Sequence, residues 1–330
     1  MAMTSTFRSI FACVLSAYSV LTIADPSPET LVKIQSSTFK ISAERNSGTV
    51  QAGSAVLVAP DKLITNCHVL TWAKKILVLR DGEHWPAKLI AADREHDLCL
   101  LSAPGIPFAP ATTAQQLQIG QEVHAAGFPG GGNFSVSCGL VRALHALDSA
   151  EVIQTNANFN PGASGGGLFD RDGNLAGILT FRAVGGGDFH FVMPVAWVVA
   201  LVARSDAVDV AKSLDMAFYQ RGQVKQPFFL QAATLESRQN WTGLLDLAQR
   251  WNTQQSDNAE SWMAIGKACV ALSKKEQATS AFRQVLSLNA QHSLGKYWLS
   301  TVAPIETCGE GASPCPIGDD VLAFMEPVLP

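Results

Sequence analysis

The sequence has no excess of positive charge and no long apolar run in its body. Lysine and arginine number 24 against 28 aspartate and glutamate, a formal net charge of −4. A nucleic-acid partner bound through a basic face is therefore not expected, because phosphate contacts need clustered cations. Charged residues are only 16% and hydrophobic residues 47%, which excludes a disordered polyelectrolyte. No body segment reaches the roughly 18 apolar residues of a membrane-spanning helix.

Signals for metal and cofactor binding are also missing. No C-x-x-C pair is present, so a zinc ribbon is not indicated. The glycine runs at 130–132 and 185–187 lack the strand–glycine–helix context of a phosphate-binding loop. Five histidines show no metal-ligand spacing and are interpreted as surface or core residues: His84, His96, His124, His145 and His292. No metal or cofactor is therefore expected.

The N-terminus has the pattern of an export signal. Arg8 gives a short positive region, residues 9–23 are apolar, and a small residue, Ala24, precedes a cleavage site. We expect residues 1–24 to be removed, which leaves no stable membrane span in an exported protein. Retention as a membrane anchor is the alternative, although the apolar segment is short for a span.

Export predicts an oxidising compartment, so the cysteines are candidates for disulfides. Of the seven cysteines, Cys13 would leave with the signal, and six would remain: Cys67, Cys99, Cys138, Cys269, Cys308 and Cys315. Cys308 and Cys315 flank a loop that could close as a small disulfide. Spacing alone does not fix the pairing.

Two regions of different composition follow the signal. Residues 30–205 contain many short apolar or alternating runs separated by turn signals, which predict a β-barrel or β-sandwich. The segment VAWVVALVARSD after Pro194 is expected to be a closing helix. From about residue 222 the composition shifts to alanine, glutamine, leucine and tryptophan with a helical period. Residues 303–330 are expected to be a loose tail.

The helical region, residues 222–302, resembles a tetratricopeptide repeat. A frame of about 34 residues starts at Ala259, and a fainter copy precedes it. An ordinary helical hairpin is the alternative. Two repeats are short of a stable array, so we expect packing on the β region or a capping helix around 296–302. The matching positions are Trp262, Ile265, Gly266, Ala278 and Phe282, with Phe228, Ala232, Leu235, Leu244 and Ala248 in the earlier copy.

Three segments carry residues for nucleophilic catalysis: LITNCHVL with His68, HDLCLL with Asp97, and NPGASGGGLF with Ser164. A serine hydroxyl attacks poorly at neutral pH unless a base accepts its proton, and histidine is that base. A buried aspartate orients the histidine and stabilises its charged form. Because Gly162 lacks a side chain, the chain can turn so that the N–H groups of Gly162 and Ser164 face an oxyanion.

These segments resemble the chymotrypsin-like (trypsin-fold) serine endopeptidases, in particular the bacterial exported HtrA/Deg branch. The matching stretches are TNCHV, DLCLL and NPGASGG, and the similarity covers about residues 45–200. The resemblance implies an all-β double six-stranded barrel with the site between the barrels, a protein or peptide substrate, and a periplasmic or secreted location. It also implies a His68–Asp97–Ser164 triad with an oxyanion hole at Gly162 and Ser164.

The chain departs from the family pattern at several positions. Ala163 replaces the aspartate that binds a freed N-terminal amine in digestive enzymes, so that zymogen switch cannot operate. Gly167 replaces a proline of the Deg branch, and the helical region follows where a PDZ-like segment would be. Cys67 and Cys99 stand beside triad residues. They could form a disulfide or remain two buried thiols.

By position within the family, five residues are expected to contact the substrate: Thr180, Phe181, Arg182, Phe189 and His190. Phe189 would suit an apolar or small side chain before the cleaved bond. No aspartate is evident at the base of the pocket, so a preference for arginine or lysine is not supported. His190 would accept an acidic side chain or be structural.

Two rival interpretations remain. GASGG also fits the G-x-S-x-G elbow of α/β-hydrolases, but a strand–turn–strand pattern, rather than a helix, follows Ser164. The second rival is a catalytically inert scaffold whose helical repeats bind partner proteins. The presence of all three triad residues favours the enzyme, and its repeats would then recruit a substrate or protein partner.

Overall fold

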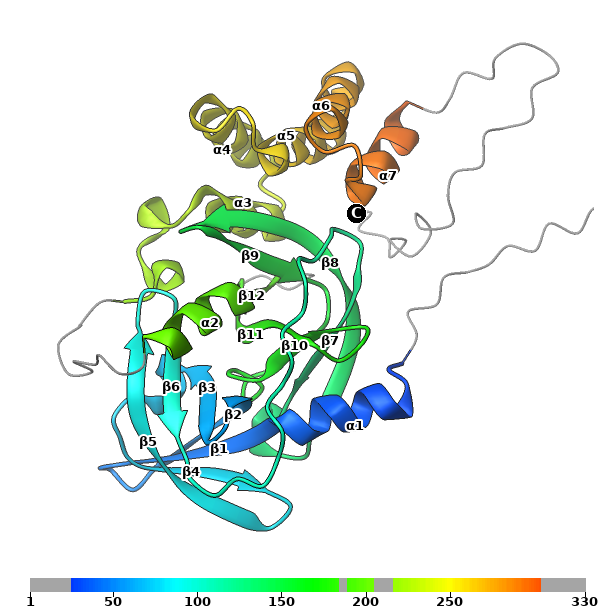
Figure 1. Cartoon of the computed structure of the whole chain (residues 1–330). Helices are drawn as coiled ribbons and strands as arrows, with labels where there is room; N and C mark the ends of the chain where they lie inside the picture. Colours follow the sequence, from blue (N-terminus) through cyan, green and yellow to red (C-terminus); the bar gives the residue numbers. More distant parts are fainter. Residues whose placement is uncertain (1–24, 184–188, 205–215, 304–330) are drawn as a thin grey trace, which may run out of the picture.

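The computed structural model describes residues 25–183, 189–204 and 216–303 (Figure 1). The expected signal peptide, the Cys308–Cys315 loop and nearly all of the expected tail lie outside the described residues. No helix in the described part is both long and apolar enough to cross a membrane.

Two closed six-stranded barrels form the body of the molecule (Figure 1). The first has the order β1-β2-β3-β6-β5-β4, with bounds Thr38–Arg45, Val50–Ala59, Lys62–Asn66, Ala73–Arg80, Glu83–Asp93 and Leu98–Ser102 for β1 to β6. The second has the order β10-β11-β12-β9-β8-β7, with bounds Glu122–Gly127, Ser135–Leu147, Ala150–Thr155, Gly167–Asp170, Leu175–Arg182 and His190–Pro194 for β7 to β12. The expected double-barrel architecture is confirmed.

The first barrel closes around alternating apolar side chains. In β1, Phe39, Ile41 and Ala43 are fully buried, while the residues between them are partly exposed. This period of two places successive side chains on opposite faces of a strand. The barrel core also contains Leu57 and Leu63.

A helix precedes the first barrel, where the sequence interpretation has β structure from residue 30. Helix α1 (Pro28–Ser37) begins at Ser27, whose side chain accepts a hydrogen bond from the Thr30 N–H. Pro28 in the first turn is compatible with a helix because its missing N–H would have no intrahelical partner. Lys33 of α1 donates to Asp172 O at 2.9 Å, which holds the helix against the second barrel.

Six further helices are α2 (Val195–Ala203), α3 (Phe228–Ser237), α4 (Trp241–Gln254), α5 (Ala259–Ala271), α6 (Lys275–Leu288) and α7 (Ser293–Val302), with short 3₁₀ turns at Cys67–Leu70, Pro129–Gly131, Phe218–Gln220 and Gln223–Lys225. Helix α2 follows Pro194 as predicted. Asparagine side chains cap α4 and α5. Gly266 permits close packing of α5 on α6, because a Cβ there would lie 2.3 Å from the Phe282 ring.

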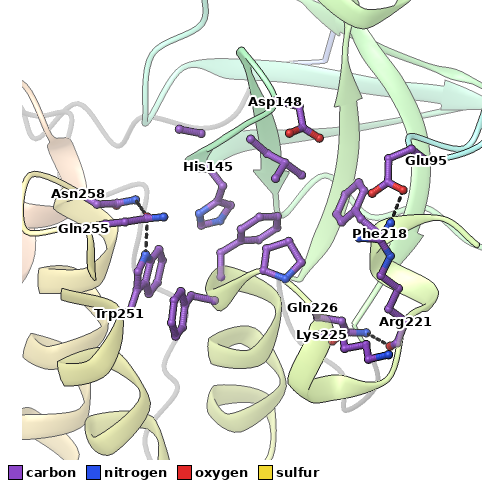
Figure 2. A pocket seen from close by; sticks show the side chains of 15 residues that line it. Glu95, His145, Asp148, Phe218, Arg221, Lys225, Gln226, Trp251, Gln255 and Asn258 are labelled. Atoms are coloured by element: carbon purple, nitrogen blue, oxygen red, sulfur yellow. Dashed lines mark hydrogen bonds and ion pairs between the residues drawn. The ribbon is translucent and has the colours of Figure 1, made fainter. Parts of the chain in front are cut away.

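The helical region packs directly on the second barrel. Phe229 of α3 stacks on His145 of β8, with ring centroids 4.4 Å apart and planes 6° apart. Ser293 at the start of α7 donates to Ile119 O at 3.0 Å. Figure 2 shows the cleft at this junction, with Glu95 and Asp148 on its barrel side, Trp251 on its helical side and Arg221 on the segment before α3. The cleft has a volume of about 430 Å³. None of the candidate triad residues lines this cleft.

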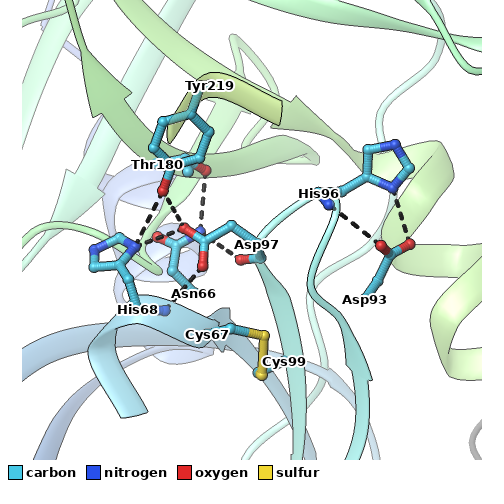
Figure 3. The surroundings of a disulfide bond; sticks show 9 residues. All are labelled: Asn66, Cys67, His68, Asp93, His96, Asp97, Cys99, Thr180 and Tyr219. Atoms are coloured by element: carbon cyan, nitrogen blue, oxygen red, sulfur yellow. Dashed lines mark hydrogen bonds and ion pairs between the residues drawn. A yellow bond between two sulfur atoms is a disulfide. The ribbon is translucent and has the colours of Figure 1, made fainter. Parts of the chain in front are cut away.

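A disulfide joins Cys67 to Cys99 within the first barrel (Figure 3). Strand β6 pairs with β3 so that Cys99 lies opposite Thr65, two positions before Cys67. The bond therefore ties the start of the 3₁₀ turn after β3 to β6. Cys138 and Cys269 are free thiols.

Replacing both bonded cysteines by alanine tests this cross-link. The two residues are 32 positions apart, and loss of the constraint on the unfolded chain should lower the free energy of unfolding by about 3 kcal/mol. Urea denaturation of Cys67→Ala/Cys99→Ala measures the change, and Cys138→Ala is the control. If a thiol reductant left the wild-type urea midpoint unchanged, the bond would be absent in solution.

Candidate active site

The His68 imidazole and the Asp97 carboxylate form a paired unit in the first barrel. Asn66 ends β3, and His68 follows in the 3₁₀ turn Cys67–Leu70. Asp97 Oδ2 lies 2.6 Å from His68 Nδ1, and Asp97 Oδ1 accepts the His68 backbone N–H at 2.8 Å (Figure 3). The carboxylate fixes the proton on Nδ1, which leaves Nε2 as the basic nitrogen.

The conformation of Asp97 is unusual and depends on its neighbours. Its φ of 56° lies in the left-handed region, where aspartate is tolerated more readily than most residues. Asn66 Nδ2 donates to Asp97 O at 3.0 Å and to Thr180 Oγ1 at 3.1 Å. Asp97 is 3% exposed, whereas the His68 side chain is 31% exposed. The carboxylate is therefore buried, and the imidazole faces the solvent side of the site.

Ser164 lies on a loop of the second barrel that the first barrel holds in place. Ser54 of β2 donates its N–H to Ser164 O at 2.8 Å and its hydroxyl to Gly162 O at 2.8 Å. Gly162 has φ +97°, and a Cβ there would lie 2.6 Å from the Gly130 amide nitrogen. Gly165 has φ +87°, and its Cβ would meet Ser54 O at 2.1 Å. Glycine is required at both positions.

Two backbone donors beside Ser164 are available to a ligand. Neither the Gly162 N–H nor the Ser164 N–H donates a hydrogen bond to another described residue. The Ser164 hydroxyl donates to Thr180 O at 3.3 Å, and within the described residues it makes no hydrogen bond to His68. The hydroxyl must therefore turn from Thr180 O toward His68 Nε2 for proton transfer, as is common in sites without substrate.

The five expected substrate contacts lie at the end of β11 and around β12. Thr180 is buried, and its hydroxyl donates to Ile178 O at 2.8 Å, so its side chain serves packing rather than the open cleft. The Phe181 ring stacks between Phe191 at 5.0 Å and Tyr219 at 4.0 Å. Arg182 is exposed and Phe189 is partly exposed. His190 is buried, with its ring centroid 4.8 Å from that of Phe159.

A second histidine–aspartate pair lies beside the first (Figure 3). His96 Nδ1 is 2.9 Å from Asp93 Oδ2, and His96 Nε2 is 3.2 Å from Asp148 Oδ2. Burial alone would lower the pKa of His96, but the hydrogen bond and charge of Asp93, and then those of Asp148, outweigh it and raise this pKa. Burial would raise the pKa of Asp93, but the bond and charge of His96 lower it. The His96 ring also stacks on Trp197 at 3.7 Å.

Comparisons with known proteins relate the double barrel to trypsin-like peptidases. Residues 53–178 match the family model described as a trypsin-like peptidase domain. The chain is 38% identical over 146 residues to a probable periplasmic serine endoprotease, DegP-like, of Chlamydia muridarum, covering 42% of this chain and 29% of that protein. A protein of the same name from Halomonas elongata is 36% identical over 167 residues, covering 47% and 35%. The chain thus spans about a third of the length of these relatives.

Solved structures share the architecture. HtrA-type protease AlgW with tripeptide has 29% identity and a TM-score of 0.50, covering 53% of this chain and 62% of that chain. Protease Rv3671c of Mycobacterium tuberculosis in its active form has 24% identity and a TM-score of 0.51, covering 63% and 96%; at this identity it supports the fold alone. The double-barrel region is therefore similar to that of an HtrA-type protease.

Three residues of the site have no role in the sequence interpretation: Ser54, Asn66 and Tyr219. Ser54 and Asn66 both lie within the stretch GSAVLVAPDKLITNCHV, which contains His68. Their place in this stretch was a signal that they could belong to the site. Tyr219 lies outside every motif, and its hydroxyl donates to Asp97 Oδ2 at 2.6 Å. No local sequence pattern indicates this contact.

Replacing His96 by glutamine should reduce stability in a pH-dependent way. The raised pKa of His96 stabilises the fold fully below its unfolded value of about 6.5, and this contribution is lost as pH rises through the folded pKa. The lowered pKa of Asp93 stabilises the fold at pH values above the unfolded pKa of aspartate, about 3.9, so this contribution is the same at both pH values tested below. Urea denaturation should therefore show a loss about 1–2 kcal/mol larger at pH 5.5 than at pH 8.5. His84→Gln, at an exposed site, is the control; equal losses at both pH values would contradict the paired state.

Proposed function

We propose that the protein is a serine endopeptidase that hydrolyses peptide bonds in protein substrates through an acyl-enzyme. The observation that carries this proposal is the His68–Asp97 pair. Asn66 links Asp97 to Thr180, whose carbonyl accepts the Ser164 hydroxyl, and the Gly162 and Ser164 N–H groups have no hydrogen-bond acceptor among the described residues. The match of residues 53–178 to the trypsin-like peptidase model and the similarity of the chain to serine endoproteases support it. The proposed catalytic domain spans residues 30–205.

Each proposed step uses a group of this chain. Ser164 Oγ attacks the scissile carbonyl carbon while His68 Nε2 accepts the hydroxyl proton. The Gly162 and Ser164 N–H groups donate to the negative oxygen that forms. His68 then transfers the proton to the leaving amine, which leaves an acyl-enzyme on Ser164. A water molecule attacks this ester while His68 accepts its proton, and return of the proton to Ser164 Oγ releases the carboxylic acid product. Asp97 stabilises the imidazolium at each step.

The proposed substrate contacts are Thr180, Phe181, Arg182, Phe189 and His190. The burial of Thr180 and His190 favours support of the cleft wall rather than direct side-chain contact with a substrate. The exposed Arg182 and the partly exposed Phe189 are the members best able to meet one. Phe189 favours an apolar or small side chain at the cleaved position.

Loss of the Ser164 hydroxyl is the direct test of the proposed reaction. Full-length wild type should bind a fluorophosphonate probe covalently and cleave casein, and Ser164→Ala should lose about 10⁴-fold or more of the cleavage rate. Ser47→Ala, in the exposed turn between β1 and β2, is the matched control and should retain both activities. Wild type that neither labels nor cleaves, like Ser164→Ala, would instead favour the inert scaffold.

We also propose that residues 222–302 are a tetratricopeptide-like unit that binds a protein partner or the substrate. Consecutive packing of α3 on α4, α4 on α5, α5 on α6 and α6 on α7 supports this assignment. Contact of the unit with the second barrel supplies the extra packing that two repeats need. The signal pattern at residues 1–24 and the periplasmic names of the relatives support export from a bacterial cytoplasm.

Hydrogen exchange of full-length Ser164→Ala with unfolded casein tests the role of the helices. If the helices bind the chain to be cleaved, amides in residues 228–302 should exchange more slowly with casein, together with amides around the cleft. A natively folded protein of similar size is the control ligand and should give no protection. Protection confined to the two barrels would contradict substrate binding by the helices.

A further inference from the structure

The segment before helix α3, residues 216–227, contacts the candidate active site. Phe218 is 1% exposed, and its N–H donates to Glu95 O at 3.1 Å. Arg221 pairs with the Glu95 carboxylate. Glu95 stands two residues before Asp97, so this segment is fixed to the turn that carries the acid. Tyr219 lies between these two anchors.

Tyr219 reaches the carboxylate through its hydroxyl group (Figure 3). The hydroxyl donates to Asp97 Oδ2 at 2.6 Å and lies 3.5 Å from His68 Nδ1. The ring stacks on Phe181 with a centroid separation of 4.0 Å and an interplanar angle of 12°. The hydroxyl is therefore held at the oxygen that also binds the imidazole.

No nearer hydroxyl serves this oxygen among the described residues. Thr180 is adjacent, but its hydroxyl donates to Ile178 O and accepts from Asn66. Burial, followed by the charge of Asp97, raises the pKa of Tyr219, so the phenol stays protonated at any working pH. It is a permanent donor to a carboxylate that is 3% exposed.

We propose that Tyr219 is a positioning residue for catalysis: its hydroxyl holds the Asp97 carboxylate in the rotamer that orients His68. This inference rests on the proposed peptidase function. A carboxylate with two donors on one oxygen and one on the other has its rotation fixed. With the hydroxyl removed, the His68 ring loses part of its orientation, which slows the chemical step and leaves substrate binding unchanged.

Tyr219→Phe removes the hydroxyl and keeps the ring on Phe181, and Tyr297→Phe on helix α7 is the matched control. With a small ester substrate and enzyme counted by active-site titration, Tyr219→Phe should lower kcat about tenfold, as expected for a lost bond to a charged group. KM should stay within about twofold. A merely structural role would lower Tm and leave kcat per active molecule unchanged, which would overturn the inference.

A spectroscopic readout separates this inference from the proposed function. In the Ser164→Ala background, which needs no activity, the downfield proton resonance of His68 Nδ1 reports its bond to Asp97. Tyr219→Phe should broaden this resonance through faster exchange with water, and Tyr297→Phe should not.

The two outcomes are then distinct. An unchanged resonance and unchanged kcat in Tyr219→Phe, with wild type labelled by fluorophosphonate, overturn the role of Tyr219 and keep the peptidase. A broadened resonance with unlabelled wild type supports the hold of Tyr219 on the Asp97–His68 pair, but overturns the peptidase and with it the catalytic role of Tyr219.

Discussion

Burial of the Asp97 carboxylate is the constraint on which the active-site arrangement depends. The residue is 3% exposed, and a buried carboxylate without partners costs several kcal/mol. Its partners are the backbone N–H and Nδ1 of His68 and the hydroxyl of Tyr219. Three segments distant in sequence must therefore meet: the turn after β3, the start of β6, and the segment that follows α2.

Hydrogen bonds also join distant segments at the boundary between the two barrels. His68 and Asp97 belong to the first barrel, and Ser164 belongs to the second. Ser54 joins them, because it binds Gly162 O and Ser164 O and also accepts the Phe128 N–H. Its contacts hold the carbonyl groups of Gly162 and Ser164, which fixes the loop that carries Ser164 to β2 without an aspartate at position 163.

Short motifs predicted much of this arrangement, since the groups around His68, Asp97 and Ser164 are encoded within a few residues of each. The double barrel followed from resemblance, whereas local patterns alone left a barrel and a sandwich open. The Cys67–Cys99 bond stayed open because spacing does not reveal that β3 pairs with β6. Helix α1 was missed because its capping by Ser27 lies at the edge of the signal-like segment.

Tyr219 shows why the rest of the site could not be predicted from the sequence. Its partner Asp97 is 122 positions away, and its placement depends on how the helices pack. Burial lowers the pKa of His145, which keeps that ring neutral and lets it stack on Phe229 of α3. Gln226, just before α3, donates to Tyr219 O at 2.6 Å and to Arg221 O at 3.1 Å. Displacement of α3 must break these bonds or move Tyr219. If a protein partner binds the helices as proposed and favours one position of α3, it would move Tyr219 and so change the proposed catalysis.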